Sequence, residues 1–119
     1  MSQPKAENQI DYIELPVSQI ASTKEFYGAA FGWKFEDYGP AYTSFFDGRL
    51  AGGFTTDRPA PGHGLLLVIY SSDLNAAQQK IKGAGGAIVK QTFSFPGGRR
   101  FHFTDPSGNE LAVWSDVAE

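Results

Sequence analysis

Three residues on predicted strands could exchange protons with a ligand or bind a cation: Glu14, His102 and Glu110. Strand alternation places His102 on the face opposite its apolar neighbours Phe101 and Phe103, and a similar pattern surrounds Glu14. A carboxyl group in an apolar cleft can act as a general base, and an imidazole can be its partner or a metal ligand. We therefore consider Glu14, Glu110 and His102 as candidate catalytic residues.

Each of these three residues also has a plainer interpretation. His102 could be a hydrogen-bonded or partly exposed strand residue, and Glu110 could be exposed or support the turn before it. Glu14 could lie on a solvated sheet face, or pair with Arg100 or Lys34. The residue types alone leave these alternatives open.

A second set of residues could hold an organic ligand by aromatic stacking and one charged contact. Strand alternation places several aromatic side chains on the same side as the polar groups, and small ligands are usually held between aromatic walls and a few polar groups. The Arg99-Arg100 pair could grip a carboxylate through two hydrogen bonds. The alternatives are a dimer interface for the rings and a solvated strand end for the arginines. The predicted ligand-binding residues are Tyr12, Phe46, Phe54, Tyr70, Arg100 and Trp114.

The elements that must position these residues occur in the same order twice. A strand, a helix and three strands are predicted from Ile10 to about Asp57, and the order returns from Leu65 to Trp114. Each half is too short to bury its sheet face readily alone. We therefore predict a mixed α+β domain over residues 10–119, with modules at about 10–57 and 64–115, and a ligand in the trough between two like sheets.

The first predicted helix begins at a capping box, residues 22–25, and ends at Gly32. A hairpin is predicted from Ala41 to Thr56, because two β-rich runs flank Gly48. In the second half Ser72 or Asp73 caps a helix, and the glycines that follow it close that helix. Its apolar stripe is formed by Leu74, Ala77, Ile81 and Ala84.

Composition limits the classes of function. The chain has 119 residues, a net charge of −3 and no cysteine, which argues against nucleic-acid binding and excludes disulfides and thiolate metal sites. Its longest apolar run is far shorter than a membrane-spanning helix, which needs about 20 residues. Residues 1–9 read as a flexible polar leader without the apolar stretch of a signal peptide, and His63 of the Pro/Gly-rich connector is expected to face solvent. We expect a cytoplasmic protein.

A small group of motifs occurs in the order and spacing typical of one family: Phe26-Tyr27, Phe31-Gly32-Trp33, Gly85-Gly86, Gly98-Arg99 and the run from Asp105 to Leu111. The chain resembles the vicinal oxygen chelate superfamily, which includes glyoxalase I, bleomycin-resistance proteins and extradiol dioxygenases, over about residues 10–115. The resemblance implies paired β-α-β-β-β modules whose curved mixed sheets surround a cleft, and frequent homodimers. It does not supply a reaction.

The resemblance also implies where a divalent metal ion would bind, using His and Glu from four strands. Counted from the motifs, three of these positions fall on Tyr12, near Leu66, and on Ala112. The fourth lies within residues 49–56, which contain no His, Asp or Glu. Apolar side chains cannot bind a divalent cation, so we predict no metal ion or other cofactor.

Three functions stay open. The first is metal-independent binding of a small organic ligand in the cleft. The alternative is a lyase or isomerase of the glyoxalase type that uses Glu14, His102 or Glu110 as acid, base or displaced metal ligands. A third is a structural or regulatory dimer whose cleft is filled by its own side chains. Glyoxalase I activity itself is not expected, because its mechanism needs the metal to polarise substrate oxygens.

Overall fold

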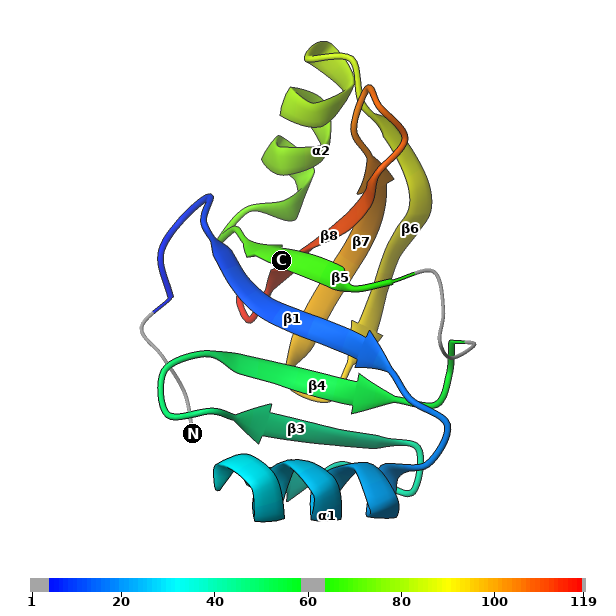
Figure 1. Ribbon diagram of the computed structural model, residues 1–119. Coiled ribbons are helices and arrows are strands. Elements are labelled where there is room, and N and C mark those ends of the chain that lie inside the picture. The colour runs from blue at the N-terminus through cyan, green and yellow to red at the C-terminus, as the bar shows by residue number, and fades with distance from the viewer. Residues whose placement is uncertain (1–4, 59–63, 119) are drawn as a thin grey trace. The chain divides into compact units, whose positions relative to one another are not determined.

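The computed structural model describes residues 5–58 and 64–118 and divides them into two compact units (Figure 1). Unit 1 is built from Asp11–Leu66, and unit 2 from Lys5–Ile10 together with the chain from Leu67 onward. The two units correspond to the two predicted modules, apart from a few residues at their ends. That the modules fold as one domain stays a prediction.

Unit 1 contains one helix and a four-stranded mixed sheet. Its elements in chain order are β1 (Ile10–Pro16), α1 (Ile20–Phe31), β2 (Lys34–Asp37), β3 (Tyr42–Phe46) and β4 (Ala51–Thr55). The strand order is β2-β3-β4-β1: β1 is parallel to β4, and the other pairs are antiparallel. The predicted hairpin is confirmed as β3 and β4, whose turn is held by the Asp47 carboxylate accepting from the backbone N–H of Leu50 at 2.6 Å.

Unit 2 repeats this arrangement. Its elements are β5 (Leu66–Tyr70), α2 (Leu74–Gly83), β6 (Ala87–Phe95), β7 (Gly98–Thr104) and β8 (Glu110–Ser115). The strand order is β5-β8-β7-β6, with β5 parallel to β8 and the other pairs antiparallel. The α+β class and the duplicated β-α-β-β-β order are therefore confirmed.

Helix α1 begins earlier than the capping box predicts. Its N-cap is Gln19, which makes no capping hydrogen bond with its side chain. Thr23 lies within the first turn, and its hydroxyl donates backward to the carbonyl oxygen of Gln19 at 2.6 Å. The capping-box prediction was wrong, whereas the predicted end at Gly32 is confirmed by its left-handed conformation, with φ of 74°.

Helix α2 begins where the sequence predicts. The Asp73 carboxylate accepts from the backbone N–H of Ala76 at 3.0 Å, which satisfies one free donor of the first turn. The chain leaves the helix through Gly85, whose φ of 102° suits glycine. Lys80 and Lys82 lie in the last turn, where positive charge is favourable.

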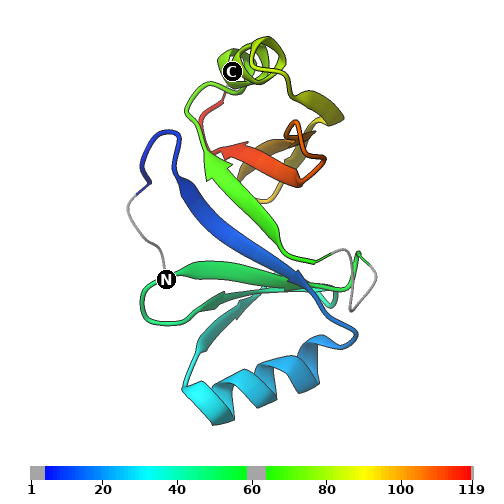
Figure 2. The same cartoon turned by 45° about the horizontal axis from the view of Figure 1, so that its top comes forward.

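Aromatic side chains form the core of unit 1 on the α1 side of its sheet. Tyr27 of α1 stacks on Trp33 and on Phe54 of β4, with ring centroids 4.6 and 5.3 Å apart. Trp33 in turn stacks on Phe45 at 4.8 Å. Figure 2 shows α1 lying along one side of the unit 1 strands, so this face of the sheet is the one that the helix covers.

The core of unit 2 lies between α2 and the β6–β7–β8 part of the sheet. Leu74 of α2 packs with Phe101, Phe103 and Val113, and Ala77 and Ile81 pack against this cluster. The apolar stripe predicted for the second helix is thus confirmed at three of its four residues, Leu74, Ala77 and Ile81. The odd-numbered residues of β7 consequently face the helix.

The structure describes part of the predicted leader and part of the predicted connector. Within the leader predicted over residues 1–9, Glu7 accepts a hydrogen bond from the backbone N–H of Ser72 at 3.0 Å, and Asn8 donates to the carbonyl oxygen of Tyr70 at 2.9 Å. His63 of the connector lies outside the described residues. No helix in the described ranges is both long and apolar enough to cross a membrane.

We expect Leu74→Ala to lower the free energy of unfolding by about 2–5 kcal/mol, because it removes a side chain that is 1 % exposed and leaves a cavity in the unit 2 core. Urea unfolding followed by far-UV circular dichroism measures this change. The matched control is Gln79→Ala on an exposed position of the same helix, expected within about 0.5 kcal/mol of the wild type. Equal losses in the two variants would contradict the assigned core.

Candidate functional site

The face of the unit 2 sheet opposite α2, here called the His102 face, gathers most of the predicted site residues. On β7, Arg100 and His102 alternate with the helix-facing phenylalanines. Strand pairing sets Arg100 beside Trp114 and His102 beside Ala112. Because directly paired residues of neighbouring strands point to the same face, these side chains share one surface.

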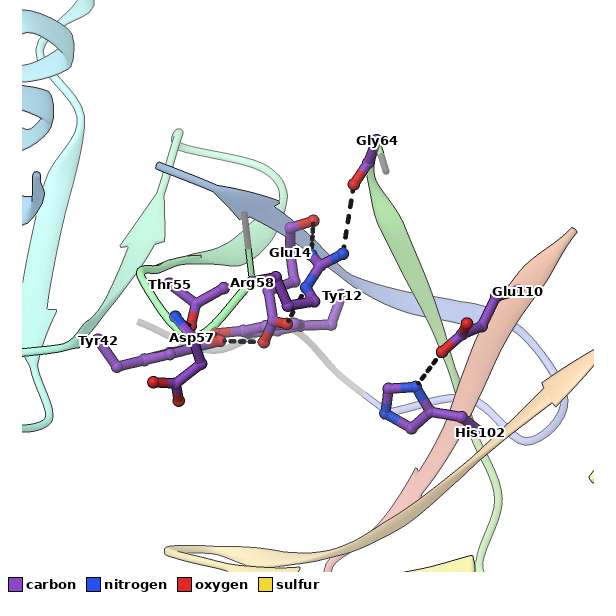
Figure 3. A network of polar contacts seen from close by, with 9 residues as sticks. All are labelled: Tyr12, Glu14, Tyr42, Thr55, Asp57, Arg58, Gly64, His102 and Glu110. Atoms are coloured by element: carbon purple, nitrogen blue, oxygen red, sulfur yellow. Dashed lines mark hydrogen bonds and ion pairs between the residues drawn. The ribbon is translucent and has the colours of Figure 1, made fainter. Parts of the chain in front are cut away.

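His102 and Glu110 form a hydrogen-bonded pair on this face (Figure 3). The Nδ1 atom of His102 lies 2.8 Å from Oε2 of Glu110. The His102 side chain is only 6 % exposed, whereas that of Glu110 is 53 % exposed. The second ring nitrogen of His102, Nε2, is buried and has no hydrogen-bond partner among residues 5–58 and 64–118.

The surroundings of His102 favour its neutral form. Burial lowers the pKa of His102 below 6.5, and the nearby positive charges of Arg100 and Lys90 act in the same direction, while the hydrogen bond to Glu110 opposes them. A neutral imidazole beside a carboxylate carries its proton on the nitrogen that faces the carboxylate. Nδ1 is therefore the donor to Glu110, and Nε2 has a free lone pair.

Aromatic rings line the His102 face. The ring of Trp114 lies 5.4 Å from that of Tyr70 and 6.2 Å from that of Phe95, and Phe93 lies 5.9 Å from the imidazole of His102. The hydroxyl of Tyr70 donates to Asp116 at 2.7 Å. The structure thus brings the predicted Tyr70, Trp114, Arg100, His102 and Glu110 together within unit 2, and adds Phe93 and Phe95.

Phe93 and Phe95 were missed because simple alternation fails along β6. The register of β6 against β7 shifts between Ile88 and Lys90 and again between Lys90 and Phe93. Lys90 pairs with His102 and Phe93 with Arg100, so three steps on β6 correspond to two on β7. Such a bulge turns residues of opposite parity to the same face. The signal that could have identified them is their position: both lie on the strand directly before the one that carries Arg99 and Arg100.

Positive charge lies against these rings. The guanidinium of Arg100 is 5.4 Å from the ring centre of Phe93 and 5.9 Å from that of Phe95, and the ammonium of Lys90 is 4.4 Å from Phe93. Cations in these positions are attracted by the electron-rich faces of the rings. The His102 face therefore combines aromatic surface, positive charge and an acceptor, Nε2 of His102, that has no partner among the described residues.

A second group of predicted residues lies in unit 1, on the sheet face opposite α1. The hydroxyls of Tyr12 and Tyr42 lie 2.7 Å apart, and Tyr42 donates to Oε2 of Glu14 at 3.0 Å (Figure 3). Arg58 approaches the same carboxylate, with Nε 3.5 Å from Oε1, and donates to the carbonyl oxygen of Glu14 at 3.2 Å. Glu14 is 3 % exposed, so its buried charge is compensated inside unit 1.

The tyrosine pair depends on the absence of a side chain beneath it. A Cβ atom at Gly53 would lie 2.0 Å from the hydroxyl oxygen of Tyr42 and 2.6 Å from that of Tyr12. Gly53 pairs directly with Glu14, so the two tyrosine hydroxyls lie over the backbone beside this carboxylate. Tyr42 and Arg58 were not among the predicted site residues, and neither occurs in a recognisable motif.

Phe54 lies on a different face from the one predicted. It is 1 % exposed and packs against Tyr27 and Phe45 on the α1 side of the sheet, as a core residue. It also borders a shallow groove between α1 and the end of β1. Phe46 pairs with Ala51 and shares the parity of Tyr42, which places it on the face opposite α1, as predicted.

The positions implied for a metal ion do not fit one. Leu66 and Ala112 are 2 % and 0 % exposed and carry no donor atoms in their side chains. The hydroxyl of Tyr12 is engaged with Tyr42. In the part of the chain that the structure describes, no three His, Asp or Glu side chains come together as a group able to hold a metal ion. We therefore derive no chemical step through a metal.

Comparison with known proteins gives the class. Residues 9–113 match the Glyoxalase/Bleomycin resistance protein/Dioxygenase superfamily, and the chain belongs to this family. An uncharacterised protein of Mycolicibacterium smegmatis is 29 % identical over 116 residues, covering 94 % of this chain and 97 % of that protein. The anthracycline biosynthesis protein DauV of Streptomyces sp. is 31 % identical over 87 % of this chain, which spans only 45 % of that relative.

Solved structures share the fold at low sequence identity. A hypothetical protein of Bacillus halodurans superposes with a TM-score of 0.75 at 15 % identity, covering 96 % of this chain and 98 % of that chain. The methylmalonyl-CoA epimerase of Mycobacterium tuberculosis superposes with a TM-score of 0.69 at 14 % identity, covering 100 % of this chain and 94 % of that chain. These similarities confirm the fold and do not transfer an activity.

Tyr42→Phe is expected to change how stability depends on pH. Burial, with the nearby Tyr12 and Glu14, raises the pKa of Tyr42 far above 10.0, so the folded protein keeps a proton that the unfolded chain loses. The contribution is complete below about pH 10 and is lost as the pH rises further. Phenylalanine cannot ionise, and the variant should therefore lose stability less steeply above about pH 10 than the wild type.

The same variant should be less stable near neutral pH, by about 1–3 kcal/mol, because it removes a donor to the buried Glu14 carboxylate. Urea unfolding curves recorded from neutral to strongly alkaline pH measure both effects. Parallel stability curves for the two proteins would contradict the assigned role of the Tyr42 hydroxyl.

Proposed function

We propose that the chain binds a small organic ligand on the His102 face of unit 2, without a divalent metal ion. The observation that carries this proposal is the buried Nε2 atom of His102, which lacks a hydrogen-bond partner among the described residues while aromatic rings line the same face. A buried acceptor without a partner costs free energy that a bound donor would recover. Aromatic walls around a single oriented polar group are typical of sites for small organic molecules.

The aromatic residues supply the contact area for such a ligand. Trp114 and Phe95 are half-buried, so part of each ring is available for stacking. Trp114 lies directly beside Arg100 on the neighbouring strand. Burying these rings against a planar molecule would give most of the binding free energy, and the polar groups would orient it.

Binding without a metal is supported by the side chains at the positions implied for one. Ala112, beside His102, has no donor atom. DauV is named for anthracycline biosynthesis, which is compatible with an organic ligand for a related domain. A homodimer and a cytoplasmic location stay predictions, based on the family resemblance and on composition.

A second candidate function is a lyase or isomerase reaction started by proton abstraction. The observation that favours it is the His102–Glu110 pair, because a neutral imidazole oriented by a carboxylate can accept a proton at Nε2. The C–H bond of an activated substrate carbon would break, an N–H bond would form at Nε2, and Glu110 would stabilise the resulting imidazolium. A solved neighbour is a methylmalonyl-CoA epimerase, but at 14 % identity it supports only the fold.

Ligand binding can be tested with the two tryptophans as reporters. Because the chain has only two, protein labelled with 5-fluorotryptophan gives one fluorine resonance from Trp114 and one from Trp33, assigned with Trp33→Phe. Hydroxylated and methoxylated naphthalenes and larger aromatic compounds are titrated in the presence of a chelator. We expect a saturable change of the Trp114 resonance, and affinity at least about tenfold lower in Trp114→Ala.

Trp33 is the internal control, because it packs between α1 and the unit 1 sheet. Circular dichroism and urea unfolding check that Trp114→Ala still folds. No saturable change with any aromatic compound would count against the proposal. Binding that appears only when a divalent metal is added would contradict its metal-free form.

The second candidate function predicts exchange of a carbon-bound proton with solvent. Small oxygenated acids and thioesters are incubated with the protein in deuterium oxide, and loss of the α-proton signal is followed by proton NMR. Exchange should occur with the wild type and fall at least about 100-fold in His102→Gln, the lower end of the range for removing a general base. Exchange that persists in this variant would remove His102 from the role of base.

A further inference from the structure

The hydrogen bond between His102 and Glu110 decides what kind of group can approach Nε2. The half-exposed Glu110 carboxylate accepts in this contact, so Nδ1 of His102 donates to it. The neutral ring has one N–H, and this contact uses it. Nε2 can then only accept a hydrogen bond, and a ligand must bring the donor.

We infer that the ligand class of this site is a planar aromatic molecule with a ring hydroxyl group, which donates its hydrogen bond to Nε2 of His102. The inference rests on the proposed function, because it names the ligand class of the same face. Phe93 and Trp114 favour an aromatic ring in the ligand, because their own rings offer a surface for stacking. The buried lone pair of Nε2 calls for a hydrogen-bond donor on that ligand. No metal ion, oxidant or reductant takes part, and no covalent bond changes.

A hydroxyl group fits better than an N–H group because of the charges around His102. Arg100 and Lys90 both act on its imidazole electrostatically and both lie against the ring of Phe93. A phenolic oxygen presents its hydrogen to Nε2 and keeps its partial negative charge toward these cations. An aromatic N–H would present no such negative atom. The positive charges of Arg100 and Lys90 therefore favour an aromatic hydroxyl group over an aromatic N–H group of similar shape.

Phe93 lies beside the imidazole that the ligand is expected to reach. Its centroid is 5.9 Å from that of His102, with the two rings tilted by 36°. It lies on β6, the edge strand of unit 2, beside a register shift. Edge strands with bulges are less constrained than paired inner strands. A ligand that reaches Nε2 is thus expected to stack on Phe93 or displace it.

The experiment compares 2-naphthol with 2-methoxynaphthalene, which keeps the ring and the oxygen but has no hydroxyl hydrogen. Their affinities for the full chain are measured by isothermal titration calorimetry in the presence of a chelator. We expect 2-naphthol to bind roughly tenfold more tightly, the effect of one hydrogen bond to an otherwise unpaired buried acceptor. This ratio, the hydroxyl preference, is the quantity followed in every variant.

Variants separate the acceptor from the aromatic surface. His102→Phe should still bind both compounds, with the hydroxyl preference lost. Glu110→Ala should weaken the preference, because nothing then holds the proton on Nδ1; the change is at an exposed side chain and should leave the fold intact. Glu25→Ala, an exposed carboxylate on α1 of unit 1, is the matched control and should keep the preference unchanged.

Two further readouts test the acceptor directly. Nitrogen-15 NMR of histidine-labelled protein should show Nδ1 protonated and Nε2 unprotonated for His102 in the wild type, assigned with His102→Phe. Acidification should abolish the hydroxyl preference, because protonation turns Nε2 into a donor. The charged groups that face His102 are Lys90 on β6, Arg100 on β7 and Glu110 on β8. Burial, together with Arg100 and Lys90, holds the pKa of His102 below its ordinary range, and Glu110 opposes this shift. The preference should therefore persist through neutral pH.

The outcomes distinguish the two proposals. If both compounds bind with equal affinity, the hydroxyl inference is overturned and ligand binding on this face survives. If neither compound binds, and none of the wider aromatic panel does, both proposals fail. A preference that persists in His102→Phe, or an Nε2 atom that carries the proton, would also overturn the inference.

Discussion

Strand alternation divides the side chains of each unit between two faces, and every feature of the candidate site depends on this division. In unit 2 the face toward α2 takes Phe101, Phe103 and Val113, while the opposite face takes Arg100 and His102. A slip of one residue in the pairing of β7 would exchange the two sets. It would bury an arginine under the helix and expose two phenylalanines. The apolar packing of α2 therefore fixes the direction in which the imidazole points.

The register that brings His102 to Glu110 is set by the turn between β7 and β8. Asp105 accepts from the backbone N–H groups of Ser107 and Asn109, both at 2.9 Å, and this defines where β8 begins. Glu110 is the first residue after the turn and lies diagonally across from His102, whose direct partner is the small Ala112. Diagonal neighbours are within reach of long side chains. Turn chemistry thus determines the acid–imidazole contact.

The sequence predicts the parts of this arrangement that follow from regular periodicity. The parity of Arg100, His102 and Glu110 could be read directly, because β7 and β8 pair without irregularity. Phe54 was misplaced because it was grouped with Phe46, yet in this hairpin Phe46 pairs with Ala51. Residues of equal parity on these two strands therefore point to opposite faces, and the turn that sets this offset cannot be derived from alternation alone.

Other features needed three-dimensional information. The bulges of β6 turn Phe93 toward the His102 face, and a bulge leaves little trace in a single sequence. Tyr42 and Arg58 meet Glu14 from distant parts of the chain, so no local motif marks them. The capping box failed for a different reason: Thr23 lies inside the first turn, where its hydroxyl donates to the carbonyl oxygen of Gln19, and the helix begins earlier, with Gln19 as its N-cap. Local signals predicted the elements better than their ends.

The two modules share a layout but differ in whether their buried polar groups have hydrogen-bond partners. This difference indicates which residue could act on a ligand. In unit 1 both oxygens of the Glu14 carboxylate already have partners, one in Tyr42 and one in Arg58. In unit 2 the Glu110 carboxylate orients an imidazole whose Nε2 atom has no partner among the described residues. A proton or a donor group that arrives at Nε2 breaks no hydrogen bond within the described residues. Of the three candidate catalytic residues, His102 is thus the one with a polar atom that could interact with a ligand without first losing a hydrogen bond. Glu14 is better explained as the centre of a polar cluster that stabilises unit 1.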